Sequence, residues 1–347
     1  MKRILKQVLG VDVAQDELVV SFGKMYDDQS IESFGCKTFS NTRKGFKELS
    51  TWVKKHQDMS MAVRYVMEAT GVYHEEFAYS LVDEGEEVSI VLPNKISNYF
   101  RTLEVKTITD RTSAQTIMRF GLERKLDSWR RPNATFRTLR HLTRERDQIV
   151  DERTSVKNQL HAESAGYDPH PGSLKRMEKR QQLLDAQEKE IKDEIANVVK
   201  SDDQLQALIM ILTTIPGVGV LTAVTVLAET NGFELIRNKR QLTSYAGLDV
   251  REKQSGTSIR GKASISKRGN RSLRKAMHFP ALTAIRNEGR YKTIYANLVS
   301  KHGIKMKAAV AVQRKILELM YVLYRNNTIY DENYQSVQKA KSSHYSE

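Results

Sequence analysis

A long charged stretch from Thr135 to about Lys200 constrains the fold more than any other part of this chain. It is rich in helix-favouring residues and is broken at one place, residues 167–172, by two prolines and a glycine. Apolar residues recur on both halves with the spacing of a helical seam: Phe136, Leu139, Leu142, Ile149 and Val156, then Leu183, Leu184, Ile191 and Ile195. Residues 135–201 are therefore predicted to form a helical hairpin or coiled-coil arm.

The segment before this arm, residues 1–134, has the pattern of an α/β domain. Strands are predicted for four β-rich or apolar runs, at residues 7–13, 17–22, 61–67 and 87–92, of which the first two should form a hairpin. Helices are expected at residues 39–56, 74–84 and from about Asp110, with a break at Pro93. The alternation of strands and helices predicts a sheet covered by helices.

The segment after the arm, residues 202–330, is predicted to be helical, and residues 331–347 form a polar tail. Two apolar helices are expected around a turn at Ile215–Gly219, which resembles a helix-hairpin-helix. In such a turn, Gly217 and Gly219 would let backbone N–H groups contact a phosphate without reading sequence. A plain turn between two core helices would have the same pattern.

A basic segment between Tyr245 and Lys275 is the first candidate functional site. From Ser255 onward it contains seven cations and no acidic residue: Arg260, Lys262, Lys267, Arg268, Arg271, Arg274 and Lys275. Glycines and hydroxyl residues stand among them, so a polyanion could approach the backbone closely and meet a hydroxyl group. A solvated loop that only holds nucleic acid has the same composition, which alone does not make Ser255 a nucleophile.

Composition narrows the class of protein. The 347 residues suffice for two or three domains, and a formal charge of +14 with a pI near 9.6 favours a nucleic-acid partner, with a basic housekeeping protein as the alternative. The single Cys36 excludes an intrachain disulfide framework and a cysteine-rich zinc site. No apolar stretch approaches the roughly 20 residues of a membrane span, and no cleavable signal peptide is evident, so a cytoplasmic protein is expected.

Three carboxylates of the first domain form the second candidate site. Asp12 interrupts an apolar strand, Glu68 ends another strand, and Asp110 opens a helix. A buried carboxylate needs compensation, and oxygen-rich clusters of this kind select Mg²⁺ or Mn²⁺. Two such ions about 4 Å apart can assist phosphoryl transfer. For each acid taken alone, a capped turn or an ion pair is the competing interpretation.

The order of several motifs along the chain resembles that of Piv-type transposases of insertion-sequence family 110. These motifs are Gly10-Val11-Asp12, residues 67–73 (MEATGVY), Thr109-Asp110 with Ala114, Ile215–Gly219, Tyr245–Leu248, Gln254-Ser255-Gly256, and Lys267–Asn270 with Leu273-Arg274. The resemblance covers nearly the whole chain. It implies a RuvC-like domain of the RNase H fold, a coiled-coil connection and a helical transposase domain.

The same resemblance implies a set of site residues and partners. Asp12, Glu68 and Asp110 match the first three acids of a metal-binding DEDD set, and Ser255 matches a serine nucleophile. DNA would be the substrate in a bacterial cytoplasm, with a non-coding bridge RNA that selects donor and target and with assembly into a homodimer or homotetramer. Arg260, Lys262, Lys267, Arg268, Arg271 and Arg274 would hold the nucleic-acid backbone.

One position departs from the family pattern. Ser113 stands where the fourth acid of the set is expected, one helical turn after Asp110 and on the same face. A hydroxyl is a weaker ligand for a hard cation than a carboxylate, although it can coordinate directly or through water. Asp127 is a conceivable substitute for the fourth acid, with a solvent-facing side chain as the competing and favoured interpretation.

Three functions therefore stay open at this stage. The first is a transposase in which Ser255 attacks a DNA phosphate beside a Mg²⁺ site, with nucleophile and acids supplied by different domains. The second is a RuvC-like junction-resolving nuclease in which water attacks and Ser255 only binds. The third is a non-catalytic nucleic-acid-binding protein whose acidic site has decayed at Ser113.

Overall fold

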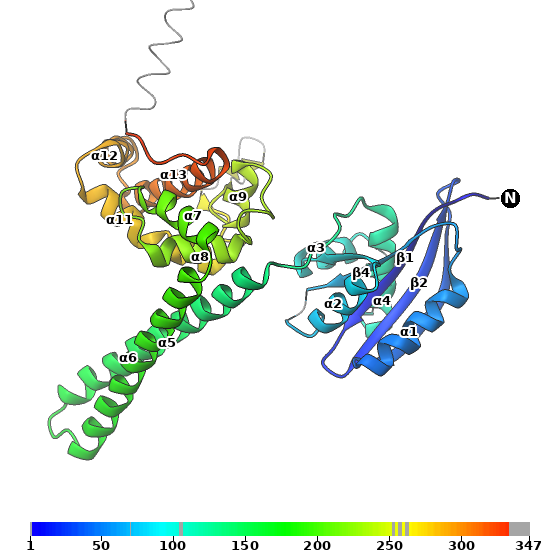
Figure 1. The fold of residues 1–347 in the computed structure, drawn as a ribbon, viewed down its shortest axis with the longest axis horizontal. Coiled ribbons are helices and arrows are strands. Elements are labelled where there is room, and N and C mark those ends of the chain that lie inside the picture. The colour runs from blue at the N-terminus through cyan, green and yellow to red at the C-terminus, as the bar shows by residue number, and fades with distance from the viewer. Residues whose placement is uncertain are drawn as a thin grey trace, which may run out of the picture. The chain divides into compact units, whose positions relative to one another are not determined.

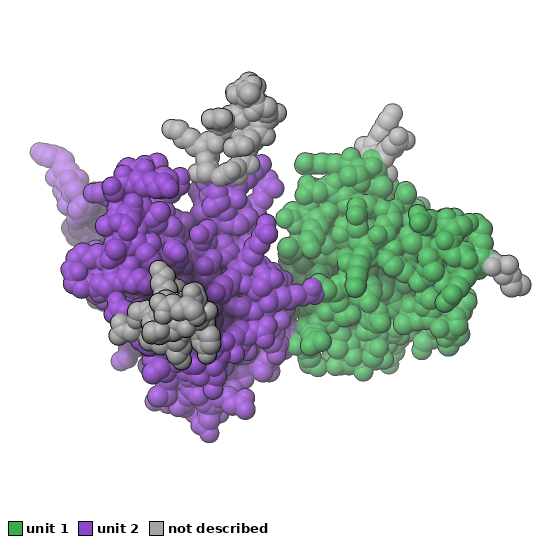
Figure 2. Space-filling view, turned by 90° about the horizontal axis from the view of Figure 1, so that it is seen from above, with its two compact units in different colours: residues 1–131 green, residues 132–347 purple. Residues whose placement is uncertain are grey.

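The computed structural model describes residues 2–69, 71–103, 107–251, 254–255, 259–260 and 264–332, with the backbone alone at 254–255 and 259–260. The chain divides into two compact units, residues 1–131 and residues 132–347, shown in green and purple in Figure 2. The expected arm and the expected C-terminal domain thus fall within one unit. In the described part of the chain, no helix is both long and apolar enough to cross a bilayer.

Unit 1 is built on a five-stranded mixed sheet (Figure 1). In chain order the strands are β1 (Ile4–Val13), β2 (Glu17–Tyr26), β3 (Ile31–Ser40), β4 (Val63–Glu68) and β5 (Glu87–Val91). Their spatial order is β3-β2-β1-β4-β5, with β2 antiparallel to β1 and to β3, and with β4 parallel to β1 and to β5. The α/β class and the predicted first hairpin are confirmed.

Helices cover both faces of this sheet. They are α1 (Arg43–His56), α2 (Glu75–Asp83), α3 (Pro93–Phe100) and α4 (Asp110–Glu123). Side chains alternate along each strand. Leu9, Val11 and Val13 of β1 therefore pack with α1 and α2 in one core, while Val8 packs with α3 and α4 in another.

The structure of unit 1 differs from the local predictions at three places. Residues 31–40 form β3, a strand the sequence pattern did not show, because this edge strand is mostly exposed and lacks a clean apolar alternation. Phe39 belongs to this strand, and the helix begins only after the N-cap Thr42, whose hydroxyl accepts a hydrogen bond from Gly45 N. Pro93 does not end structure but opens α3, since proline suits the first position of a helix.

Unit 2 begins with two long helices, α5 (Ala134–Ser164) and α6 (Pro171–Lys200), which pack along each other as an arm (Figure 1). Most of the predicted seam is buried: Leu139, Leu142, Ile149, Val156, Leu184, Ile191 and Ile195. Leu183 is a wrong member, because its side chain is 57% exposed. Pro171 again takes the first helical position, so the joint shrinks to residues 165–170.

The described part of unit 2 contains seven more helices: α7 (Asp203–Thr213), α8 (Val220–Thr230), α9 (Lys239–Tyr245), α10 (Arg271–Ala276), α11 (His278–Arg286), α12 (Arg290–His302) and α13 (Lys305–Asn326). One continuous apolar core runs from the arm through α8 to α13. This shared core is the reason the arm and the C-terminal helices form one compact unit.

In unit 1, α4 approaches the backbone of β1 closely. A Cβ atom at Gly10 would stand 2.2 Å from Met118 N and 2.4 Å from Ala114 O, so only glycine fits there. Farther along the helix, a Cβ at Gly121 would meet Val8 Cγ1 at 2.7 Å. Contacts in this order show that α4 runs antiparallel to β1 and that its beginning lies beside the end of β1.

We expect Gly10→Ala to lower the free energy of unfolding of unit 1 by about 1–3 kcal/mol, because α4 must move away from β1. Gly23→Ala is the matched control, since the nearest atom to its added Cβ is the flexible Met118 Sδ. Denaturant unfolding of the full chain measures both variants. Equal losses for the two would contradict the backbone approach at Gly10.

Candidate functional site

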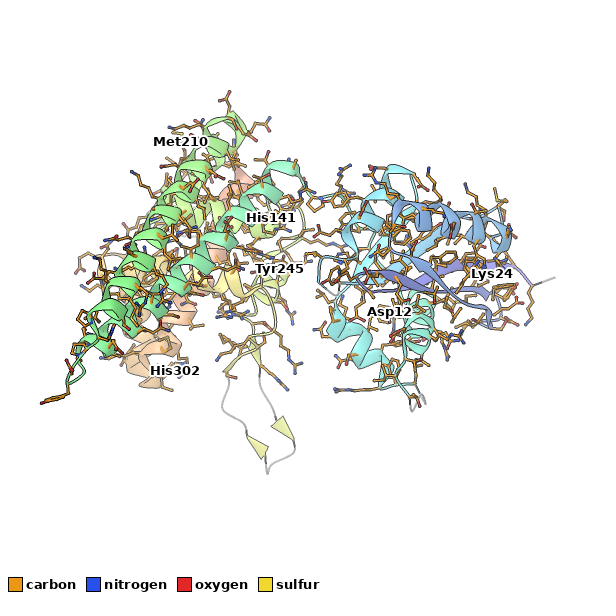
Figure 3. The ribbon with its side chains drawn as sticks, turned by 90° about the horizontal axis from the view of Figure 1, so that it is seen from below. Asp12, Lys24, His141, Met210, Tyr245 and His302 are labelled. Atoms are coloured by element: carbon orange, nitrogen blue, oxygen red, sulfur yellow. The ribbon has the colours of Figure 1, made fainter. Side chains whose placement is uncertain are left out.

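Asp12 and Glu68 lie on the same face of the sheet in unit 1, at the ends of two paired parallel strands. Val11 pairs with Met67, so Asp12 and Glu68 follow at the next position of β1 and β4. Val8 and Val66, an even number of residues before them, pack against α4, and side chains of one parity share a face. Both carboxylates therefore point to the side of the sheet that α4 covers; Figure 3 labels Asp12.

Asp110 joins them from the beginning of α4. The helix starts there because Thr109 and Thr112 form a capping box, in which Thr109 N donates to Thr112 Oγ1 at 2.8 Å and Thr112 N donates to Thr109 Oγ1 at 3.3 Å. The approach of α4 at Gly10 holds this end of the helix beside the end of β1. Two strands and one helix thus supply three acids to one region.

Burial and the negative charges of neighbouring acids raise the pKa values of Asp12 and Glu68. Burial raises the pKa of Asp12, and the negative charge of Asp110 raises it further. Burial also raises the pKa of Glu68, with a second contribution from Asp12. Both acids therefore hold their charge at a cost that a cation among them would offset.

The donor set fits a hard divalent cation in its chemistry, since carboxylate and hydroxyl oxygens are the ligands that Mg²⁺ prefers. Among the described residues, however, no group of three or more His, Cys, Asp or Glu side chains stands close enough to hold an ion. The three acids lie in one region of unit 1, but their side chains do not surround a single ion-sized site. Ser113 lies on the first turn of α4, where its side chain is half-buried and its N–H bonds Thr109 O at 2.8 Å.

Asp127 lies elsewhere on the sheet. Its carbonyl oxygen accepts a hydrogen bond from Ser89 Oγ at 2.9 Å, and Trp129 N donates to Val88 O at 2.7 Å. The segment around Asp127 therefore lies beside the first half of β5, whereas Glu68 pairs with Val91 at its end. This placement favours Ser113 over Asp127 as the fourth residue of the set.

Ser255 stands on a β-hairpin of unit 2. Two short antiparallel ladders are nested in the sequence: β6 (Val250–Arg251) pairs with β9 (Ser264–Ile265), and β7 (Gln254–Ser255) pairs with β8 (Ile259–Arg260). We call these four strands, β6 to β9, the serine hairpin. The side chains of Ser255 and Arg260, and all of Lys262, lie outside the described residues.

The cations after the serine hairpin have different surroundings. Lys267, Arg268 and Arg271 are exposed and available to a polyanion. Arg274 instead turns inward, and its Nη1 donates to the carbonyl oxygens of Ala246 at 2.8 Å, Gly269 at 3.1 Å and Asn270 at 3.4 Å. The structure therefore gives Arg274 an internal use besides its predicted contact with nucleic acid.

The turn at Ile215–Gly219 connects α7 and α8 as expected. Gly217 has a φ of +86°, and a Cβ there would stand 2.5 Å from Pro280 O, so this glycine is packed against α11. Gly219 is the N-cap of α8, is exposed and has nothing within 4 Å of an added Cβ. Of the two predicted phosphate contacts, Gly219 is the more accessible.

One buried acid escaped the sequence analysis. Glu229 lies near the end of the apolar helix α8 and is 1% exposed. An acid within an apolar run is the same signal that drew attention to Asp12. Its partners come from α5 and from the segment after the serine hairpin.

Comparison with known proteins finds transposases and a DNA-inverting relative. A family model for DEDD transposases of the IS110 type matches residues 9–164, and the model "Transposase IS116/IS110/IS902 family" matches residues 210–296. A pilin gene-inverting protein of Moraxella bovis is 28% identical over 94% of this chain and 98% of its own length. A transposase for insertion sequence element IS1111A of Coxiella burnetii is 23% identical over 93% of this chain and 91% of its own length.

Among solved structures, Thermus thermophilus RuvC in complex with a Holliday junction matches 35% of this chain and 99% of its own length, with 12% identity and a TM-score of 0.24. The two family models together span more than half of the chain and include Asp12, Glu68, Asp110 and Ser255. The chain therefore belongs to the IS116/IS110/IS902 family of transposases, enzymes that cut and rejoin DNA by phosphoryl transfer.

Proposed function

We propose that this transposase cuts and rejoins the DNA of an insertion sequence through Ser255, with Asp12, Glu68 and Asp110 holding Mg²⁺ or Mn²⁺ at the same phosphate. The observation that carries the proposal is the convergence of the acids: strand pairing places Glu68 beside Asp12, and the approach of α4 at Gly10 brings Asp110 to the same end of β1. Their negative charges and burial raise the pKa of Asp12 and of Glu68. Acids placed in this way serve a bound cation better than they serve stability. The sheet order β3-β2-β1-β4-β5 supports an RNase H-like, RuvC-like domain.

In the proposed reaction, Ser255 Oγ attacks a DNA phosphorus atom and forms a phosphoserine bond. The bond from phosphorus to one deoxyribose oxygen breaks, that oxygen takes up a proton, and the serine hydroxyl loses one. A strand hydroxyl then attacks the phosphoserine, which restores the serine and joins the new strand. The bound cation supplies charge stabilisation to the phosphate oxygens.

The charge distribution supports DNA as the ligand of unit 2. Residues 237–275 contain twelve Lys and Arg but only two Asp and Glu. Such a segment neutralises phosphates and releases their counterions, which favours binding without reading sequence. Arg260, Lys262, Lys267, Arg268 and Arg271 are proposed to contact the backbone, with Gly217 and Gly219 offering N–H groups and Arg274 bracing the segment.

Nucleophile and acids belong to different units, so the working site is proposed to be composite. Completion of one site by residues of two copies would account for a homodimer or homotetramer. Selection of donor and target DNA by a non-coding bridge RNA is proposed on the family resemblance. The enzyme is placed in the bacterial cytoplasm, where its DNA substrate lies.

A junction-resolving nuclease is the second candidate, because all three acids lie within unit 1 and could activate water without Ser255. The two reactions differ in one product. Only a serine nucleophile leaves protein covalently attached to DNA after denaturation. The non-catalytic alternative predicts DNA binding without any Mg²⁺-dependent product.

Ser255→Ala is expected to abolish the covalent protein–DNA adduct and to slow strand exchange by at least about a thousandfold, since the attacking oxygen is gone. The measurement is denaturing electrophoresis of labelled DNA after reaction, with DNA affinity measured in parallel. Ser264→Ala in β9 is the matched control and should form the adduct normally. An active Ser255→Ala protein would overturn the serine mechanism.

Asp12→Asn is expected to stabilise the metal-free protein at neutral pH and to flatten its pH dependence. The folded-state pKa of Asp12 is raised, so the wild type gains stability as pH falls through this raised pKa toward the ordinary aspartate value of about 3.9. Added Mg²⁺ should stabilise the wild type at neutral pH and affect the variant much less.

Unfolding titrations with and without Mg²⁺ between about pH 4 and pH 7 measure this difference. Asp16→Asn, on the exposed turn after β1, serves as the control and should respond to Mg²⁺ as the wild type does. Equal Mg²⁺ stabilisation of Asp12→Asn would show that Asp12 is not a ligand.

A further inference from the structure

The Glu229 carboxylate is the centre of a buried polar network in unit 2. Arg144 Nε and Nη2 donate to its two oxygens at 2.7 and 2.8 Å, and Asn270 Nδ2 donates to Oε2 at 2.6 Å. The hydroxyl of Tyr245, labelled in Figure 3, donates to the main-chain carbonyl of Glu229 at 2.9 Å. Burial alone would raise the pKa of Glu229, but the hydrogen bonds from Arg144 and Asn270 outweigh it and lower the pKa.

This network holds the two chain segments from which the serine hairpin leaves the helical unit. Asn270 N donates to Tyr245 O at 2.7 Å, Lys267 N to Gly247 O at 3.1 Å, and Ser266 N to Asp249 O at 2.8 Å. We call these paired segments, residues 245–249 and 266–270, the hairpin root. The ladder between β6 and β9 begins directly after the root.

The two segments of the root pack closely against each other. A Cβ at Gly269 would stand 2.4 Å from Tyr245 O and 2.7 Å from Gly247 N, so two backbones cross there and exclude any side chain. The glycines of the basic segment are predicted from the sequence to let a polyanion approach the backbone, but at Gly269 the chain's own backbone fills that space. Arg274 stabilises this crossing, because its Nη1 donates hydrogen bonds to Ala246 O on one segment and to Gly269 O on the other.

The same network ties the root to the arm. Arg144 belongs to α5, and Arg140, one turn earlier, donates through Nε to Ala228 O at 3.0 Å. Lys275, on α10 after the root, bonds Asp151 of α5 at 2.8 Å. Three charged side chains of α5 therefore bond α8, whose Glu229 accepts from Asn270 of the root, and α10, which directly follows the root.

We propose that Glu229, held by Arg144 and Asn270, is the positioning residue that sets the direction in which the serine hairpin projects. This inference rests on the proposed role of Ser255. A two-stranded hairpin is marginal by itself and takes its orientation from its root. Glu229 reaches both Arg144 on the arm and Asn270 in the root, so its carboxylate couples the two.

The competing interpretation is that Glu229 contributes only to the stability of the core. The arm offers a matched carboxylate for this comparison. Glu188 of α6 is 4% exposed and is ion-paired with Arg146, Arg153 and Lys192, so it is also buried and held by cations. Its partners all lie on the arm and not in the root.

The experiment compares Glu229→Gln with Glu188→Gln in the full chain. Glutamine keeps the size of the side chain but loses the charge and one acceptor oxygen. Hydrogen exchange is measured at the amides of Ser266, Lys267 and Asn270, which close the root. We expect Glu229→Gln to speed their exchange at least about tenfold and Glu188→Gln to leave it unchanged.

A kinetic readout accompanies the exchange data. At saturating DNA, Glu229→Gln should slow formation of the Ser255 adduct at least about tenfold, with DNA affinity within about twofold of wild type. If Glu229→Gln does not fold, Asn270→Ser replaces it: serine still caps α10 through Leu273 N but is too short to reach Glu229. Circular dichroism verifies the fold of each variant.

Unchanged root amides in a folded Glu229→Gln or Asn270→Ser protein would overturn the inference. So would an equal effect of Glu188→Gln, which would assign both acids to general stability. Failure of the serine mechanism itself gives a different result, because the wild type would then form no adduct while the exchange data still test the root.

Discussion

The close approach of α4 to β1 at Gly10 is the constraint on which unit 1 depends. Because the backbones nearly touch there, the beginning of α4 lies beside the end of β1, and Asp110 comes within electrostatic range of Asp12. The capping box at Thr109 then fixes where the helix starts. The strand register positions the third acid: because Val11 pairs with Met67, Glu68 lies next to Asp12 on the face that α4 covers.

Two acids in apolar surroundings have pKa values that are shifted in opposite directions. Asp12 has a raised pKa, with Asp110 as a like-charged neighbour, whereas Glu229 has a lowered pKa because Arg144 and Asn270 donate to it. A carboxylate that a cation compensates is part of the framework, whereas at Asp12 the main-chain hydrogen bond from Val13 does not offset burial and the charge of Asp110, so a bound cation would stabilise it. Glu188, held by three cations of the arm, belongs with Glu229 in this respect.

The sequence predicted best where the physical signal is local. Apolar patterns in the sequence predicted the first hairpin and the buried seam of the arm. The roles of Asp12, Glu68 and Asp110 rest on the order of motifs and stay predictions. The sequence predicted poorly where contacts with distant residues determine the structure. The edge strand β3 is mostly exposed, and Leu183 of α6 is exposed although it lies next to a buried seam residue. Gly269 is required by the backbone of Tyr245, 24 residues earlier in the chain. Glu229 carried a readable signal, but its partners Arg144 and Asn270 are distant in the sequence.

The crossing of the two segments in the hairpin root limits how this part of the chain can vary in sequence. A Cβ at Gly269 would stand 2.4 Å from Tyr245 O, so no other residue fits there. Gly247, on the opposite segment, has a φ of +66°, which side-chain-bearing residues rarely adopt. Each segment of the root therefore contains one position that requires glycine, and transposases that share this crossing should keep glycine at both positions.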